Sequence, residues 1–340
     1  GKMTFREMAF TLACVVTAVS GAYEPTPTAA KAALRSLFAS DGDSVLACPR
    51  TKGPLQSEVS VIGSIKRENK VSPEGVRYPV REYNDLLESS SRNTDLSVDE
   101  LRDEIASLWS TRTQTQLFRS PVTSWLYERG WRQNFANAGF PGIEREYEEV
   151  AEFFAPLAGG VVVDMSCGSG LMSRRILSSR RFGRVLALDY SETMLRETRR
   201  RTIAADLPVQ DLELCRADVA NLPLQTDSID AMHAGAALHS WPQLELGLSE
   251  IVRVLKPGGR FFATTFLQGA YGVRVPGTEG ASSGGSFRFF RSEEELTSLL
   301  VDAGFPRDAI QVRREGRGCA VIRVALADGG NTARANSEYV

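Results

Sequence analysis

The chain has 340 residues, with 40 Lys and Arg against 42 Asp and Glu, and 42% of its residues are hydrophobic. This composition excludes wholesale disorder, and the net charge of −2 argues against a generally basic surface that binds nucleic acid. Five cysteines and two histidines occur without a Cys-x-x-Cys pair, which excludes a disulfide framework and an all-cysteine zinc site. We therefore expect a soluble protein without a bound metal.

The first forty residues differ in composition from the rest. Lys2 and Arg6 precede an apolar run at 8–22 that ends in small residues, as in a secretory signal peptide. The next stretch, 26–40, is rich in Ala, Ser and Thr and lacks acidic residues, as in an organelle transit peptide. Together they resemble the bipartite presequence of algae with secondary plastids, which implies that residues 1–40 target the protein to the plastid (chloroplast). The alternative is an apolar N-terminal helix that packs on the domain or lies at a membrane.

Two regions precede the regular part of the chain. Residues 46–91 mix short β-favouring pieces with turn residues, which predicts a small module. Apolar residues in 93–110 recur at helical spacing, and 118–134 is rich in aromatic and basic side chains. We therefore expect a helical lid or linker over 93–150, with an acidic helix at 144–154.

From residue 160 onward, strand-like and helix-like stretches alternate. The predicted strands are 161–164, 185–188, 212–216, 229–234, 260–266, 310–313 and 320–324, and the predicted helices are 170–179, 191–204, 244–255 and 292–303. This alternation predicts βαβ units and a parallel sheet. Only a few residues around 315–318 join the last two strands, so these pair as a hairpin and one edge strand runs antiparallel. We predict an α/β fold with a doubly wound, seven-stranded sheet over 151–328.

The first of these strands leads into a loop of small residues. The apolar run at 161–163 ends in Asp164, and the loop that follows contains Ser166, Gly168 and Gly170 before the helix begins. Small residues let the backbone approach a ligand closely, and the N-terminus of a helix attracts polar groups. The loop is shorter than the G-x-G-x-x-G fingerprint of dinucleotide-binding folds and does not match it.

Acidic residues also follow the next two strands. The apolar stretch at 185–188 ends in Asp189, where a carboxylate can accept hydrogen bonds from both hydroxyls of a ribose. Asp218 follows the third strand, where it can accept a hydrogen bond from an adenine amino group while the N–H of Val219 reaches a ring nitrogen. Each acid alone could equally cap a strand or face solvent. Asp164, Asp189 and Asp218 together, at this spacing, predict a site for a nucleoside.

With these residues in order, the stretch from about 151 to 326 resembles the class I S-adenosylmethionine-dependent methyltransferases that act on small molecules. The resemblance implies a Rossmann-like fold and S-adenosylmethionine as the cofactor. It implies that ten residues contact this cofactor: Asp164, Ser166, Gly168, Gly170, Asp189, Tyr190, Met194, Asp218, Val219 and Ala236. Ser166 stands where such enzymes usually have glycine, and serine has less backbone freedom.

A narrower resemblance extends upstream. It is carried by four stretches: 117–121, 126–135, 164–170 and 233–242. They are similar to the uncharacterised, plastoglobule-associated chloroplast methyltransferases of plants and algae, in which Ser166 is the expected residue. These relatives, like a bacterial ribosomal RNA methyltransferase family, carry an N-terminal zinc ribbon of paired cysteines. Here Cys48 stands where a pair would begin and position 51 is Thr, so the likeness implies a degenerate ribbon at 46–91 without its metal.

Candidates for catalysis and substrate binding lie outside the cofactor loops. His239 follows the fourth strand, beside the expected methyl group, and is the candidate general base. The alternative is a histidine that is structural or contacts the cofactor, and His233, within the strand, is expected to be structural. Tyr127, Trp131 and Arg132 lie in the helical segment that commonly covers such sites, where they contact substrate or pack in the core.

The leading hypothesis is methyl transfer from S-adenosylmethionine to a small-molecule acceptor. The lipid-droplet association of the plastoglobule family suggests a lipophilic plastid metabolite, met at a membrane or droplet surface. No metal is expected, and nucleic acid is disfavoured as a partner. Two alternatives stay open: methylation of ribosomal RNA, from the layout of ribbon plus methyltransferase, and a non-catalytic scaffold or assembly subunit that retains the fold.

Overall fold

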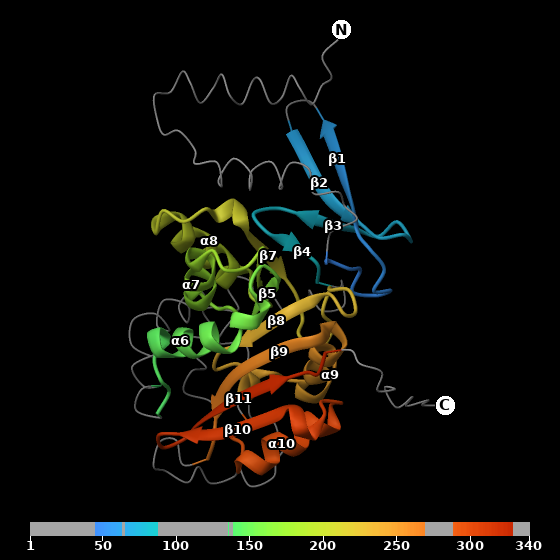
Figure 1. Ribbon diagram of the computed structural model, residues 1–340. Helices are drawn as coiled ribbons and strands as arrows, with labels where there is room; N and C mark the ends of the chain where they lie inside the picture. Colours follow the sequence, from blue (N-terminus) through green and yellow to red (C-terminus); the bar gives the residue numbers. More distant parts are fainter. Residues whose placement is uncertain (1–44, 63–64, 88–134, 136–138, 269–287, 329–340) are drawn as a thin grey trace, which may run out of the picture. The chain divides into compact units, whose positions relative to one another are not determined.

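A computed structural model describes residues 45–62, 65–87, 135, 139–268 and 288–328 of the protein (Figure 1). The expected presequence and most of the expected lid, with Tyr127, Trp131 and Arg132, lie outside these residues. No helix within the described ranges is long and apolar enough to cross a membrane.

Strands and helices alternate from residue 143 onward. The elements are α6 (Ile143–Phe153), β5 (Val161–Met165), α7 (Leu171–Ser179), β6 (Arg184–Asp189), α8 (Glu192–Ala204), β7 (Leu212–Arg216), β8 (Ile229–Ala234), α9 (Leu244–Val254), β9 (Leu255–Phe266), α10 (Glu293–Asp302), β10 (Ile310–Glu315) and β11 (Cys319–Ala325). Each strand and helix predicted from residue 144 onward coincides with one of them. The largest difference is β9, which begins at Leu255 rather than Arg260 because Leu255 already pairs with Ile229 of β8, before a shift in register.

The last seven strands are ordered β7-β6-β5-β8-β9-β11-β10 in the sheet. Strands β7, β6, β5, β8 and β9 are parallel neighbours, whereas β11 pairs antiparallel with both β9 and β10. The prediction that the antiparallel strand lies at the edge was wrong. The hairpin places β11 inside, next to β9, and β10 forms the edge.

Apolar runs in the strands account for helices on both faces of the sheet. Four of the five residues of β5 are buried, as expected for a parallel strand covered on both sides. Val162 packs in a cluster with residues of α6, α7 and α8, and its neighbour Val163 packs in a second cluster with residues of α9 and α10. Consecutive side chains of a strand point to opposite faces, so the two helix layers follow directly from the run of valines.

The N-terminal part of the described chain extends the same sheet. Strands β1 (Gln56–Ile62), β2 (Ile65–Val71), β3 (Arg77–Val80) and β4 (Asn84–Asp85) are antiparallel neighbours in this order, and β4 pairs parallel with β7. The sheet therefore has eleven strands, not the predicted seven, and is mixed at both ends. Without β4, strand β7 would be an edge of the sheet, and such an edge offers unpaired backbone groups to a further strand.

Candidate functional site

The carboxyl ends of four parallel strands form the candidate site. Strands β7, β6, β5 and β8 are adjacent in the sheet and run in one direction. Asp164 lies in β5, Asp189 ends β6, Asp218 follows β7 and Ala236 follows β8. Open α/β sheets bind ligands outside the carboxyl ends of the strands, at the point where the strand order reverses. That point lies between β5 and β8 here.

The loop between β5 and α7 adopts left-handed backbone conformations. Ser166, Gly168 and Gly170 have φ angles of 56°, 55° and 73°. A Cβ atom on Gly170 would lie 2.4 Å from Cγ2 of Thr198 on α8, so only glycine fits there. Ser166 carries a side chain in a conformation that favours glycine. Its Oγ accepts a hydrogen bond of 3.0 Å from the indole Nε1 of Trp241, which glycine could not do.

The Asp189 carboxylate is oriented by backbone N–H groups. Its Oδ2 accepts a hydrogen bond from Gly168 N at 2.9 Å, and its Oδ1 accepts one from Ser191 N at 2.8 Å. Burial raises the pKa of Asp189 to about 6, although both N–H groups favour the charged form. The contact with Gly168 ties the end of β6 to the loop after β5, so one carboxylate joins two of the predicted contact regions.

Asp218 closes a tight turn after β7. Its Oδ1 accepts a hydrogen bond of 2.9 Å from the N–H two residues further on, and its carbonyl oxygen accepts one of 3.0 Å from Asn221 N. Val219 is buried, and a Cβ atom added to Gly247 on α9 would lie 3.3 Å from both Val219 and Trp241. Trp241 therefore links this turn with the loop after β5.

Two further predicted contacts lie close to Asp189 in the chain. Met194 is buried in the first turn of α8, and its N–H donates a hydrogen bond to Oγ of Ser191, the N-cap of that helix. Tyr190 is half-buried, and its carbonyl oxygen accepts a hydrogen bond of 3.1 Å from Nε of Arg216. The structure thus brings the start of α8 to the same end of the sheet.

A buried chain of polar side chains crosses β5, β8 and β9. His233 Nδ1 lies 2.8 Å from Asp164 Oδ1, and its Nε2 lies 3.2 Å from Glu146 Oε1. Thr264 donates a hydrogen bond to Glu146 at 3.1 Å and accepts one from Ala236 N at 2.8 Å. Burial works to lower the pKa of His233, but its hydrogen bonds with both carboxylates raise that pKa to about 9. Asp164 is only 2% exposed, and its second carboxylate oxygen, Oδ2, accepts a hydrogen bond of 2.5 Å from Oγ of Ser173 on α7.

Sequence reasoning missed Glu146, Thr264 and Trp241. Glu146 contacts His233 across 87 residues of sequence, and no motif spans that distance. Trp241 does lie in one of the stretches that carry the narrower resemblance, and this was the available signal. Its hydrogen bond with Ser166 depends on two loops that only the folded sheet brings together.

His239 lies in an aromatic cluster beside the carboxyl end of β9. It is 7% exposed, and its ring packs edge-on against Phe266 with 4.7 Å between ring centres. Phe135, Phe140 and Phe289 also pack on Phe266, with ring centres 4.5–5.8 Å away. Burial lowers the pKa of His239 to about 3, so the imidazole is neutral at physiological pH. It can accept a proton but is a weak base, and its role as general base stays a prediction.

Metal-binding side chains do not gather in the described ranges. Within them, no group of three or more His, Cys, Asp or Glu residues is arranged to hold a metal ion. Cys48 is buried, and its Sγ is hydrogen-bonded to the hydroxyl of Tyr78 at 3.3 Å.

The strand order, the loop with Gly168 and Gly170, and the acids at the ends of β6 and β7 are those of a class I methyltransferase. A sequence model described as "Methyltransferase domain" matches residues 163–263. The chain therefore contains a class I S-adenosylmethionine-dependent methyltransferase domain. The side chains at the ends of β6 and β7 also fit this cofactor chemically. Its ribose hydroxyls and adenine amino group donate hydrogen bonds, which the carboxylates of Asp189 and Asp218 can accept.

Other methyltransferases are also similar in sequence or structure to this chain. An uncharacterized chloroplastic methyltransferase of Arabidopsis thaliana is 52% identical over 155 residues, which cover 45% of this chain and 44% of the relative. A demethylmenaquinone methyltransferase of Clavibacter sepedonicus is 38% identical over 112 residues, covering 33% of this chain and 43% of the relative. The matches thus span less than half the length of these relatives. A crystal structure of a SAM-dependent methyltransferase from Aquifex aeolicus is 20% identical, with a TM-score of 0.45, and covers 61% of this chain and 99% of that one.

Proposed function

We propose that the protein transfers a methyl group from S-adenosylmethionine to a small, lipophilic acceptor in the plastid. The observation that carries the proposal is the placement of Asp189 and Asp218 at the carboxyl ends of adjacent strands, next to the left-handed loop after β5. In this proposal, Asp189 accepts hydrogen bonds from the ribose, and Asp218 and Val219 hold the adenine. Asp164 and the loop with Ser166, Gly168 and Gly170 approach the methionine end.

The bound cofactor would supply a methyl group on a sulfonium, ready for transfer to a nucleophile. The chain contributes mainly by aligning the acceptor with the methyl group, because holding two reactants in a reactive geometry lowers the activation barrier. A base is needed only where the nucleophile carries a proton. His239 is neutral and lies among apolar rings, so it can accept a proton. Because its pKa is low, it is a weak base and suits an acceptor group that is itself acidic.

The aromatic cluster supports an apolar acceptor. Phe266 ends β9, the strand next to β8, and Ala236 follows β8 where the methyl group is expected. Among the described residues, phenylalanine rings and the neutral imidazole of His239 therefore lie on the side where we expect the acceptor. The similarity to a demethylmenaquinone methyltransferase agrees with a quinone-like acceptor, and the similarity to a chloroplastic protein agrees with the plastid.

Calorimetric titration of S-adenosylmethionine and S-adenosylhomocysteine into the full chain tests cofactor binding. We expect micromolar dissociation constants, and Asp189→Ala should raise them about 10- to 100-fold, the loss expected for charge-assisted hydrogen bonds. Asp308→Ala, an exposed carboxylate in the short turn before β10, is the matched control and should bind as the unmutated chain does. Absence of binding by the unmutated chain would refute the enzymatic proposal and favour a scaffold.

Transfer of a radiolabelled methyl group then tests the acceptor class. The chain is incubated with labelled S-adenosylmethionine and either a plastid lipid extract or ribosomal RNA. Label in the lipid fraction, lost in Asp189→Ala, supports the proposal. Label in RNA would overturn the acceptor class, and binding without transfer to either would overturn the activity.

A further inference from the structure

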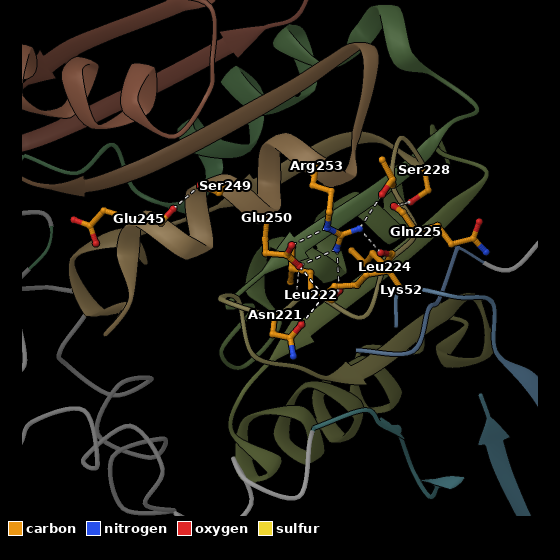
Figure 2. A network of polar contacts seen from close by, with 11 residues as sticks. Lys52, Asn221, Leu222, Leu224, Gln225, Ser228, Glu245, Ser249, Glu250 and Arg253 are labelled. Carbon is orange, nitrogen blue, oxygen red and sulfur yellow. Dashed lines mark hydrogen bonds and ion pairs between the residues drawn. The ribbon is translucent and has the colours of Figure 1, made fainter. Parts of the chain in front are cut away.

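The segment that follows Asp218 is in contact with the N-terminal module, residues 45–87. Figure 2 shows Lys52 of this module pointing toward Asn221 and Glu250. Its Nζ donates hydrogen bonds to Asn221 Oδ1 at 2.5 Å, to the carbonyl oxygen of Leu222 at 3.2 Å, and to Glu250 Oε2 at 3.1 Å. Lys52 thus binds both the turn that follows Asp218 and helix α9.

A tight turn in the module positions Lys52. The Lys52 N–H donates to the carbonyl oxygen of Cys48, and the Cys48 N–H donates to that of Gly53, both at 2.8 Å. Lys52 has a φ of 58°, so its backbone is left-handed, a conformation that non-glycine residues rarely adopt. The Cys48 side chain is fixed in turn by Tyr78 of β3. The turn where the likeness placed a zinc-binding cysteine pair instead presents a lysine to the methyltransferase domain.

The module also holds the backbone on both sides of the turn. Before it, the N–H of Leu86 donates to the carbonyl oxygen of Arg216 at 3.1 Å, continuing the pairing of β4 with β7. After it, Ala47 N donates to the carbonyl oxygen of Pro223 at 2.9 Å, and Gln225 N donates to that of Val45 at 2.8 Å. Residues 217–222 are therefore anchored at each end by the module.

Glu250 and Arg253 of α9 complete the contacts of the turn (Figure 2). Glu250 Oε2 accepts a hydrogen bond from Leu222 N at 2.7 Å, and Arg253 donates to the carbonyl oxygens of Leu222 at 3.0 Å and Leu224 at 2.9 Å. Burial works to raise the pKa of Glu250, but the Arg253 and Lys52 cations hold it below its usual value. The Glu250 side chain is 15% exposed, so its bonds are well shielded from solvent.

We propose that Lys52 is a positioning residue for cofactor binding, and that the N-terminal module forms part of the cofactor site by fixing the turn at 218–222. Asn221, held by Lys52 through its side chain, donates its backbone N–H to the carbonyl oxygen of Asp218. Two hydrogen bonds thereby link Lys52 to the backbone carbonyl of Asp218, the residue whose carboxylate would receive the adenine. The inference rests on the proposed function for the identity of the ligand.

Lys52→Met is the test, with Lys70→Met as the matched control. Lys70 lies in the same module and donates to Ser57 Oγ at 2.6 Å, away from the turn. Calorimetry should show a dissociation constant for S-adenosylhomocysteine raised roughly 10-fold by Lys52→Met, as for a lost charge-assisted hydrogen bond, and unchanged by Lys70→Met. Lys52→Arg keeps a cation in the turn and should restore part of the affinity. Equal affinities of Lys52→Met and the unmutated chain would overturn the inference.

Two further measurements separate positioning from general stability. In a double-mutant cycle, Lys52→Met should add little to the loss caused by Asp218→Asn, because Lys52 acts through Asp218. Fully additive losses would overturn this route. Amide hydrogen exchange without ligand should speed up in 217–222 for Lys52→Met, and for Asn221→Leu, which breaks the same contact from the other side, while β5 stays protected. Unchanged exchange in this segment refutes the inference even if the cofactor proves to be a different one.

Discussion

Protonation of Asp189 should control cofactor binding between pH 5 and 7. Burial raises the pKa of this carboxyl from 3.8 to about 6 in the absence of ligand. Ribose hydroxyls donate to the charged form, so binding requires the ionised carboxylate. With a pKa of about 6, the ionised fraction falls from about 90% at pH 7 to about 10% at pH 5. We therefore expect the dissociation constant of S-adenosylhomocysteine to rise about 10-fold over this interval.

Stability should change in the opposite direction as the pH falls from about 7 to 4. An acid whose pKa is raised in the folded state destabilises the fold when ionised, and folding takes up a proton as the pH falls from about 6 to 4. The penalty corresponds to about 3 kcal/mol from the shift of about two units. The unliganded chain should thus gain stability relative to Asp189→Asn on acidification, while it loses affinity.

Calorimetry at pH 5, 6 and 7 measures the affinity, and urea unfolding at the same pH values measures the stability. Near pH 6, titrations in two buffers of different ionisation enthalpy should reveal proton release on binding. Asp189→Asn is the control, and its weaker binding should not depend on pH in this interval. An unmutated chain whose affinity is constant from pH 5 to 7, or an Asp189→Asn variant with the same pH dependence, would refute the reasoning.

Further substitutions test the packing around the site. Ser166→Ala and Ser166→Gly both lose the hydrogen bond from Trp241, but glycine tolerates the left-handed backbone, so urea unfolding should find it more stable than alanine by about 1 kcal/mol. Gly170→Ala should lower the melting temperature, because its Cβ meets Thr198, and adding Thr198→Ser should recover part of the loss. His233→Gln should cost about 3–5 kcal/mol at pH 7, because two buried carboxylates lose their cation. The raised pKa of His233 makes its contribution complete below pH 6.5, so urea unfolding should show the cost shrinking as the pH rises through about 9.

The sequence predicted the methyltransferase half well because each signal there is local. An uninterrupted apolar run such as 161–163 is typical of a parallel strand that is covered on both faces, and it can be recognised without knowledge of the neighbouring strands. The loop glycines report their own backbone, and Gly168 and Gly170 do adopt the left-handed conformation that glycine favours. The acids Asp189 and Asp218 lie where each strand ends, and parallel strands bring such ends together.

The N-terminal strands were less accessible, because their structure depends on distant partners. Strand β4 has two residues, and one of its two partner strands is β7, about 130 residues later in the chain, as in the contact between Asn84 and Glu213. Its side chains carry no pattern that predicts this pairing. The missing cysteine pair directed attention to the turn after Cys48, but only the folded chain reveals that Lys52 points from it into the turn after Asp218.

The two histidines illustrate how the fold assigns chemistry that the residue type leaves open. In β8, the register with β5 places His233 opposite Asp164, and α6 adds Glu146 from the other side. Two carboxylates therefore keep that imidazole charged, with a pKa of about 9. Six residues later the chain has left the strand, and His239 packs on Phe266, where burial holds its pKa near 3. A charged and a neutral imidazole thus lie six residues apart: His233 is a cation that fixes the sheet, and His239 is a neutral ring on the side where an apolar acceptor would approach.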